Sequence, residues 1–254
     1  MIKMSYILSK KIPAFVINLE KDVKRLETIS VSLANEMMFE MVRIPAIAGN
    51  DLPHIIRSIL AHNDGWASHK GEIGCFLSHI KAWETVAATT TPFSVILEDD
   101  AILCGMHRII SANLPEDFDL IFINDRMSVG LRTDASSIPL SFVPVKNNIY
   151  LLNERDGGVG GDGYVLTPSG AKKLLATVAK DLCFGHVDWR LLRYCVAPDH
   201  LLGALEDSFV ASVLINHHNP HLPPAWDILR AYCTNTPLVH FGLLPSSRLN
   251  MNET

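Results

Sequence analysis

The sequence predicts a single α/β domain over residues 1–254, in which helices flank a mostly parallel central sheet. Three observations lead to this fold class. Apolar segments typical of buried strands alternate with amphipathic segments typical of helices. A chain of 254 residues can bury one sizeable core and lies near the upper size of a single domain. Hydrophobic residues make up 48% and charged residues 19%, which indicates a folded globular protein.

Five short apolar runs are predicted as buried strands because each has the length of a strand and few charges. They cover residues 14–19, 41–47, 93–97, 118–123 and 164–166. Amphipathic patterns with apolar residues three or four positions apart are predicted as helices. They cover residues 22–38, 71–85, 168–179 and 189–194. Most strands are followed by a helix, which indicates β-to-α units, and a glycine-containing turn is predicted at residues 49–50.

The second half of the chain carries weaker signals. Thr167 is a good helix cap and Pro168 a good first helical residue, so the helix after the last strand has a defined start. Residues 126–153 contain two prolines and few helical signals, which predicts a loop or short strands that could cover a site. Residues 217–245 are rich in proline and weakly patterned.

Charge and cysteine content exclude several functional classes. The net charge of −5, without a long basic stripe, argues against nucleic-acid binding. The apolar run at residues 13–19 is far too short to span a bilayer. The five cysteines form no C-x-x-C pair, so neither a disulfide framework nor a zinc knuckle is indicated. These features predict a protein of a reducing cytoplasm.

Three consecutive acidic residues, Glu98, Asp99 and Asp100, follow a predicted buried strand directly. Adjacent carboxylates near a core repel one another unless a positive charge neutralises them. Mn²⁺ or Mg²⁺ prefers oxygen ligands and can take phosphate oxygens of a bound nucleotide as further ligands. The triplet therefore predicts a metal site, although an isolated Glu-Asp-Asp is also typical of a solvated acidic turn.

Other polar residues are expected at the same place. Ligands of parallel α/β sheets collect beyond the carboxyl ends of the strands, where Asn18 and residues 124–125 would also lie. His240 follows a short apolar strand and precedes a glycine, so it could complete a metal site or be a structural histidine. His217 and its two neighbouring histidines, His218 and His221, lack the glutamate of a zinc motif and are predicted to lie in a solvated loop.

Two further segments carry candidate residues. Residues 156–163 match G-x-G-x-x-G, yet they precede a strand and so do not fit a dinucleotide-binding loop. This segment, which contains Asp162, is interpreted as backbone passing close to a ligand, or as an ordinary glycine turn. Asp188 lies beside Trp189, which could stack on a sugar face. Asp188 itself could act as a general base or cap the following helix.

Four blocks of the sequence together resemble glycosyltransferase family 25, which contains bacterial lipooligosaccharide galactosyltransferases and collagen-modifying enzymes. The blocks are VINLEKD at 16–22 with Arg25, GEIGCFLSH at 71–79, VILEDD at 95–100, and GYVLTPSGAKKLL at 163–175 followed by VDW at 187–189. The second block is the most specific, and the match fades after about Arg193.

The resemblance implies a GT-A-like nucleotide-diphospho-sugar transferase fold, a UDP-sugar donor and inversion at the anomeric carbon. It implies a nucleotide and donor pocket formed by Asn18, Arg25, Glu72, Ser78, His79 and Asp99. It makes Asp100 the main ligand of Mn²⁺ or Mg²⁺, with Glu98 assisting, and likens His240 to a late histidine of related enzymes. Inversion needs one general base, for which Asp188 is the first candidate and Asp162 the second.

The acceptor and location also come from the resemblance. It favours galactose as the donor sugar and a lipopolysaccharide or lipooligosaccharide core, a lipid-linked oligosaccharide, as the acceptor. Glucose differs from galactose by the orientation of one hydroxyl, and no residue distinguishes them. The expected location is the cytoplasm, with room for peripheral contact with the inner face of the bacterial inner membrane. Two alternatives are a non-catalytic nucleotide-sugar or carbohydrate binding protein and, less favoured, a zinc-dependent hydrolase built on the histidine-rich tail.

Overall fold

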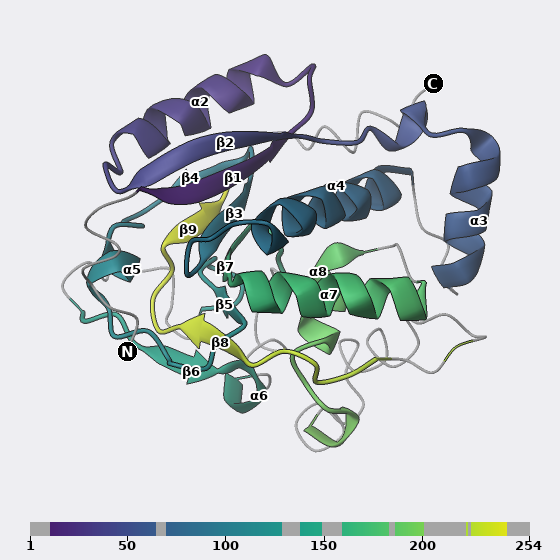
Figure 1. Cartoon of the computed structure of the whole chain (residues 1–254). Helices are drawn as coiled ribbons and strands as arrows, with labels where there is room; N and C mark the ends of the chain where they lie inside the picture. Colours follow the sequence, from purple (N-terminus) through teal and green to yellow (C-terminus); the bar gives the residue numbers. More distant parts are fainter. Residues whose placement is uncertain are drawn as a thin grey trace.

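A seven-stranded sheet lies at the centre of the protein (Figure 1). The computed structural model describes residues 11–64, 70–128, 138–148, 159–182, 186–200, 222 and 225–242. In spatial order the strands are β2 (Phe39–Pro45), β1 (Ile12–Asn18), β3 (Ser94–Glu98), β7 (Gly163–Leu166), β5 (Leu120–Phe122), β8 (Ala231–Thr234) and β6 (Phe142–Pro144). A separate two-stranded sheet pairs β4 (Ala101–Leu103) with β9 (Val239–Phe241).

Five strands of the central sheet run in the same direction. β1 is parallel to β2 and β3, and β5 is parallel to β8. β7 is antiparallel to both of its neighbours, β3 and β5, so all five parallel strands share one orientation, while β6 is reversed. The prediction of an α/β fold with a mostly parallel sheet is confirmed. The reversal of β7 brings the residues that precede it, including Asp162, to the edge where β3 and β5 end.

Helices cover both faces of the sheet. The described helices are α2 (Val23–Ala34), η1 (Gly49–Asp51), α3 (His54–Asp64), α4 (Lys70–Ala87), α5 (Arg108–Ser111), α6 (Val145–Asn148), α7 (Pro168–Asp181) and α8 (Val187–Arg193). α4 and α7 lie side by side on one face, and α2 lies against β2 and β4 (Figure 1). Among the described residues, no helix combines the length and the apolar character needed to cross a bilayer.

The two faces of the sheet have separate cores because side chains of a strand alternate between faces. Phe15 and Ile17 of β1 pack in a cluster with Phe76 and Trp83 of α4. The intervening Val16 packs in a second cluster that contains the buried residues of α2, Ile29 and Leu33. The core residues of β3 divide in the same way. Burial on both faces explains why these strands are continuous apolar runs in the sequence.

Several element boundaries differ from the prediction. The first helix ends at Ala34 and not at residue 38, because the chain turns there and the Met38 carbonyl accepts a hydrogen bond from Ile12 N of β1. The turn expected at residues 49–50 is the 3₁₀ helix η1. Helix α3 and strand β8 were not predicted, since β8 has only four residues and ends in polar Thr234. Thr167 caps α7 as expected, its side chain accepting a bond from Gly170 N.

Other predictions concern segments that are only partly described. In residues 126–153, the described part contains β6 and α6, and β6 forms the outer strand of the sheet beside β8, far from the edge formed by β2. Arg126 of this segment lines the pocket described below, and residues 129–137 and 149–153 lie outside the described residues, so the cover expected over the site stays a prediction. The three histidines at 217, 218 and 221, and the glycines at 157 and 158, lie outside the described residues. The single domain over residues 1–254 stays a prediction.

Candidate active site

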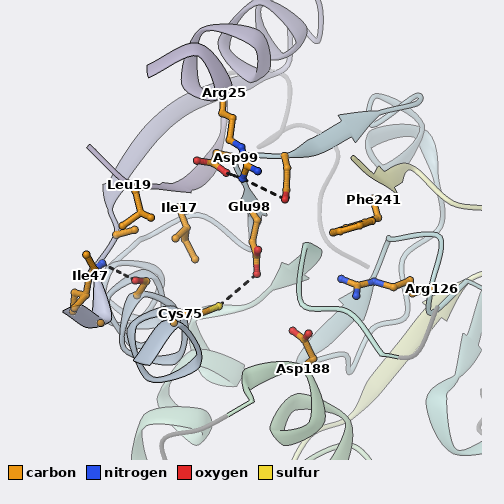
Figure 2. Close-up of a pocket in the computed structure, with 16 residues that line it drawn as sticks. Ile17, Leu19, Arg25, Ile47, Cys75, Glu98, Asp99, Arg126, Asp188 and Phe241 are labelled. Atoms are coloured by element: carbon orange, nitrogen blue, oxygen red, sulfur yellow. Dashed lines mark hydrogen bonds and ion pairs between the residues drawn. The ribbon is translucent and has the colours of Figure 1, made fainter. Parts of the chain in front are cut away.

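A pocket of about 200 Å³ opens at the edge of the sheet where β1 and β3 end (Figure 2). Its walls come from four places: the ends of β1 and β3, the segment after β2, the first turns of α4, and residues from later in the chain. The lining residues are Ile17, Leu19, Arg25, Ala46, Ile47, Ala48, Gly49, Gly71, Cys75, Ser78, Glu98, Asp99, Asp100, Arg126, Asp188 and Phe241. The acidic triplet thus faces a pocket and is not a solvated turn.

Asp99 and Asp100 lie beside the side chains of buried Asn18 and of Arg25. Asp99 Oδ2 accepts a hydrogen bond of 2.7 Å from Asn18 Nδ2, and its Oδ1 lies 3.1 Å from Arg25 Nη1. The same arginine nitrogen lies 3.5 Å from Asp100 Oδ2. Arg43 Nε donates to Asn18 Oδ1 at 3.0 Å, which fixes the orientation of the asparagine amide. Of the residues expected around the nucleotide, Asn18 and Arg25 therefore meet at Asp99.

Asp100 is held in an unusual state for a carboxyl group. Its side chain is largely buried, and its Oδ1 has no hydrogen-bond partner among the described residues. Burial, with the nearby charge of Glu98, raises the pKa of Asp100 from 3.8 to about 7, although Arg25 opposes the shift. Burial also raises the pKa of Asp99. A buried carboxylate with an unused oxygen is the kind of group that a cation would stabilise.

Glu98 points to a different part of the pocket from its two neighbours. Figure 2 shows its side chain extending away from Arg25 and toward Cys75 and Asp188. Its Oε1 lies 3.4 Å from His79 Nε2 and 3.7 Å from Cys75 Sγ. His79 is fully buried and does not line the pocket, so it contacts Glu98 from behind. The three consecutive acids thus form two separate groups.

The two candidate bases differ in their access to the pocket. Asp188 lines the pocket, and its Oδ1 accepts a hydrogen bond of 2.9 Å from Gly161 N. It lies in the first turn of α8, whose N-cap is His186, so Asp188 is not the cap of this helix. Asp162 is 1% exposed and does not line the pocket; its Oδ1 is 2.6 Å from Arg126 Nη2. Burial raises the pKa of Asp162 to about 6, against the effect of Arg126.

The late histidine lies near the site without lining it. β9 pairs with β4 so that Phe241 is opposite Ala101, the residue after the acidic triplet. Phe241 lines the pocket, and the Arg126 guanidinium lies over its ring at 4.9 Å. His240 is the neighbour of Phe241, and its Nδ1 lies 3.1 Å from Asp125 Oδ2. The structure therefore does not bring His240 into one group with Glu98 and Asp100.

The GEIGCFLSH block forms the wall opposite the sheet. Ser78 accepts a hydrogen bond from Ile47 N at 2.8 Å and donates to Gly74 O, so it holds the segment after β2 against α4. A Cβ at Gly74 would lie 2.4 Å from Ile47 O, so only glycine permits this approach. Glu72 does not line the pocket, but its Oε1 lies 3.1 Å from His186 Nε2, which links the starts of α4 and α8.

Several lining residues had no signal in the sequence. Cys75, Arg126 and Phe241 were not proposed, and neither were residues 46–49 after β2. Gly74 and Ser78 within the family-like block could have indicated a close helix contact, but not with which segment. Trp189, expected to stack on a sugar, is partly buried against the core and does not line the pocket. Its position depends on the packing of α8, which local sequence does not reveal.

The charges that line the pocket fit a divalent cation together with an anion. Four carboxylates line it, from Glu98, Asp99, Asp100 and Asp188, against the two guanidinium groups of Arg25 and Arg126. With all six groups ionised, this lining is negative and would repel a diphosphate in the absence of a cation. The oxygen donors of Asp99 and Asp100 suit Mn²⁺ or Mg²⁺, and the buried Asp100 Oδ1 supplies an available acceptor.

Fold and site together define an α/β protein with an acidic, ligand-sized pocket at the carboxyl edge of its sheet, the usual place for a nucleotide. Residues 11–188, more than half of the chain, match the family described as glycosyltransferase family 25 (LPS biosynthesis protein). The chain belongs to glycosyltransferase family 25.

Two relatives of this chain are longer proteins. Procollagen galactosyltransferase 2 of Homo sapiens is 27% identical over 165 residues, which cover 61% of this chain and 23% of the human protein. Inactive glycosyltransferase 25 family member 3 of Mus musculus is 30% identical over 179 residues, which cover 64% of this chain and 28% of the mouse protein. The chain thus spans about a quarter of the length of these relatives.

A solved glycosyltransferase structure aligns weakly with this chain. The glycosyltransferase GlyE of Streptococcus pneumoniae TIGR4 matches with a TM-score of 0.39 and 11% sequence identity. The match covers 97% of this chain and 57% of that one. A similarity of this size does not bear on function.

Proposed function

We propose that the protein is an inverting glycosyltransferase that transfers galactose from UDP-galactose to a lipopolysaccharide or lipooligosaccharide core. Family membership supports sugar transfer, and the family description names LPS biosynthesis. The human relative is named a galactosyltransferase, which favours galactose as the sugar. The observation that carries the proposal is the buried Asp100 carboxylate, whose Oδ1 lacks a partner among the described residues, at a pocket that also contains Arg25.

Asp99 and Asp100 are proposed to hold Mn²⁺ or Mg²⁺ with the donor diphosphate. When bound, the cation would stabilise the negative charge that develops on the departing diphosphate. Arg25 lies beside both acids and carries several N–H donors, so it can contact a diphosphate oxygen while still pairing with Asp99. Asn18 and Arg43 would keep the Asp99 carboxylate in place. Glu98 and His240 have weaker support as ligands, because Glu98 Oε1 lies beside His79 and His240 Nδ1 lies beside Asp125.

Asp188 is proposed as the general base. It lies across the pocket from Arg25 and Asp99, which suits attack on the face of the sugar opposite the diphosphate (Figure 2). An acceptor hydroxyl oxygen would form a bond to the anomeric carbon as the bond from that carbon to the diphosphate oxygen breaks. The hydroxyl proton would pass to Asp188, and UDP would leave with the bonding electrons. The hydrogen bond from Gly161 N orients the Asp188 carboxylate.

Replacing Asp188 by Asn tests the base. The amide keeps an oxygen to accept from Gly161 N but cannot take a proton, so turnover should fall by about 100- to 10,000-fold. The Kd of UDP should stay unchanged, because no diphosphate contact is removed. The matched variant Asp162→Asn tests the second candidate. If Asp162→Asn abolishes turnover while Asp188→Asn does not, the two roles are to be exchanged.

The first experiment is UDP release from a panel of UDP-hexoses with Mn²⁺, with and without truncated lipooligosaccharide. We expect acceptor-dependent release from UDP-galactose, lost in Asp100→Asn. Release from UDP-glucose alone would retain the transferase and change the sugar. Acceptor-dependent release with a protein or small saccharide, and none with lipooligosaccharide, would reject the proposed acceptor.

A non-catalytic nucleotide-sugar or carbohydrate binding protein is the second candidate. The observation that favours it is the similarity to a mouse family member named as inactive. Tight binding of UDP-galactose without release of UDP, with every acceptor and with both metal ions, would support this function.

A lipid-linked acceptor would bring the protein to the inner face of the inner membrane, and we propose peripheral contact there. Sedimentation with vesicles that contain truncated lipooligosaccharide tests this contact. Binding to vesicles with the acceptor but not to vesicles of phospholipid alone would assign the contact to the acceptor.

A further inference from the structure

Glu98 is separated from its acidic neighbours by the geometry of the strand end. It is the last residue of β3, and its side chain extends toward Asp188, while Asp99 lies beside Arg25 (Figure 2). The Glu98 side chain is 16% exposed and lines the pocket. A carboxylate in this position faces the space that a donor sugar would occupy between the diphosphate and the base.

A buried chain of hydrogen bonds holds the Glu98 carboxylate. Trp83 Nε1 lies 2.8 Å from the Tyr164 hydroxyl oxygen, which lies 2.8 Å from His79 Nδ1. His79 Nε2 in turn lies 3.4 Å from Glu98 Oε1. His79 and Tyr164 are fully buried, and their rings stack with centroids 5.9 Å apart.

The chain has one consistent direction of donation. The indole N–H of Trp83 can only donate, so the Tyr164 oxygen accepts from it. The Tyr164 hydroxyl hydrogen is then available to His79 Nδ1, which accepts in the neutral ring. His79 Nε2–H donates to Glu98, an acceptor when ionised. Trp83, Tyr164 and His79 therefore fix both the ring and the tautomer that present a donor to Glu98.

Cys75, His79 and Glu98 offer ligand atoms within 4.8 Å of one another, a spacing that a metal ion could also occupy. In the direction of donation given above, however, His79 Nε2 carries the hydrogen and presents a donor to Glu98 Oε1, not the lone pair that a metal ion needs. A carboxylate has about four lone-pair positions, so Glu98 can accept further hydrogen bonds from a ligand in the pocket. Hydroxyl groups of a sugar are such ligands, and a fixed acceptor distinguishes a hydroxyl by its orientation.

We propose that Glu98 accepts a hydrogen bond from a hydroxyl of the donor hexose and thereby selects the sugar, with His79 and Tyr164 as positioning residues. This inference rests on the proposed function, since it assigns a role within the same donor site. It separates the roles of adjacent acids: Asp99 and Asp100 serve the diphosphate with its cation, and Glu98 serves the sugar.

The experiment pairs Glu98→Gln with donors that each lack one hydroxyl. Glutamine keeps the shape and an oxygen for His79 but loses the negative charge. For wild type, kcat/KM should fall about 10- to 100-fold for the deoxy donor that lacks the recognised hydroxyl. For Glu98→Gln, the same deoxy donor should cause little further loss, while the other deoxy donors should have the same effect as in wild type. Selectivity between UDP-galactose and UDP-glucose should fall with it.

Asp100→Asn is the matched control, and Mn²⁺ binding by calorimetry is the second measurement. We expect Glu98→Gln to bind Mn²⁺ with UDP within about twofold of wild type, and Asp100→Asn to lose that binding while retaining the UDP-hexose selectivity of its residual activity. Loss of Mn²⁺ binding in Glu98→Gln, with additive effects for every deoxy donor, would overturn the proposal and make Glu98 a metal ligand.

Variants of His79 test the positioning chain. His79→Gln retains a donor that can reach Glu98, whereas His79→Leu has none, so selectivity should be retained more fully in His79→Gln. A structural role alone would lower stability in both variants without changing selectivity between donors. If His79→Leu does not fold, the Glu98→Gln and deoxy-donor comparison still decides the proposal.

Binding measurements distinguish failure of the transferase proposal from failure of the proposal for Glu98. If UDP-hexoses bind without turnover, the transferase proposal fails. The role of Glu98 can then be tested by how much more tightly UDP-galactose binds than UDP, in place of kcat/KM. Loss of that gain in Glu98→Gln would still support sugar recognition by Glu98, and its retention would reject it. A wild-type protein that binds neither UDP nor UDP-hexoses would overturn both proposals.

Discussion

Buried aspartates lie at both ends of the parallel strands of the central sheet, and their hydrogen-bond partners differ. Asp119 precedes β5 at the amino-terminal edge and is 4% exposed. Its Oδ2 accepts from Arg230 N at 3.0 Å and lies 2.5 Å from Lys173 Nζ. Asp100 follows β3 at the opposite edge and is 8% exposed, yet its Oδ1 has no hydrogen-bond partner among the described residues.

The difference separates a carboxylate with full partners from one that we propose to be functional. Asp119 directly precedes β5, and its partners come from the segment before β8 and from helix α7, so it joins all three. A buried carboxylate with full partners contributes to stability, whereas one with an unused oxygen opposes folding unless a ligand compensates. The lesson is that the partners of a buried acid, and not its burial, indicate a site.

The largest expected effect is on catalysis at the carboxyl edge. Asp100→Asn should lower the rate of sugar transfer at least about 100-fold, because it weakens the stabilisation of charge on the departing diphosphate. The melting temperature without metal should not fall, because the substitution removes a buried charge. Steady-state kinetics and thermal unfolding of the same preparation measure both. If Asp100→Asn transferred sugar at the wild-type rate, the proposed catalytic role of Asp100 would be rejected.

The next effect is on stability at the amino edge. Asp119→Ala should lower the free energy of unfolding by about 2–3 kcal/mol, since it leaves Arg230 N without its carboxylate acceptor and Lys173 without its ion-pair partner. Most of this loss should come from the hydrogen bond of the Arg230 N–H, because the Lys173 side chain is 45% exposed. Urea unfolding gives the stability, and the Kd of UDP should remain within about twofold of wild type.

Adding Mn²⁺ compares the two ends of the strands, at Asp100 and at Asp119, directly. Free Mn²⁺ at ten times its Kd should stabilise the wild type by about 1.4 kcal/mol, because only the folded state offers the site. Asp119→Ala should keep this gain and Asp100→Asn should lose it. Thermal unfolding with and without Mn²⁺ measures the shift. An equal gain in all three proteins would place the metal elsewhere in the chain.

The smallest expected effect concerns the helix cap beside Asp119. Thr167 Oγ1 accepts from Gly170 N at 3.0 Å, and Thr167 N donates to the Asp119 carbonyl. Thr167→Ala should therefore cost about 1 kcal/mol. Thr167→Ser, which keeps the cap, should cost much less. A loss of donor binding in Thr167→Ala would show that the two edges are coupled.

Much of the fold could be predicted from the sequence because its strands are buried on both faces. Such strands are apolar throughout, so β1, β3 and β5 stand out from their polar surroundings. β8 was missed because its four residues pair between β5 and β6 without a pattern of their own. α3 was missed as well, and nothing in the sequence required the tail to return to the sheet.

The site could be predicted in part, for a similar reason. Glu98 to Asp100 stood out because charges directly after an apolar strand lie at the sheet edge. Arg126 and Phe241 had no such signal, because they reach the pocket from distant parts of the chain. Trp189, which could have stacked on a sugar, packs against the core, while its neighbour Asp188 faces the pocket.

The sequence by itself determined the α/β class, the strand that delivers the acidic triplet and the family to which the chain belongs, because these depend on residues close together in the chain. Tertiary structure alone decided which residues surround each acid. The antiparallel direction of β7 places Asp162 beside β3, and Glu98 contacts His79 and Cys75 while Asp99 contacts Asn18 and Arg25. Those contacts join residues far apart in sequence, so their partners could be identified only once the chain had folded.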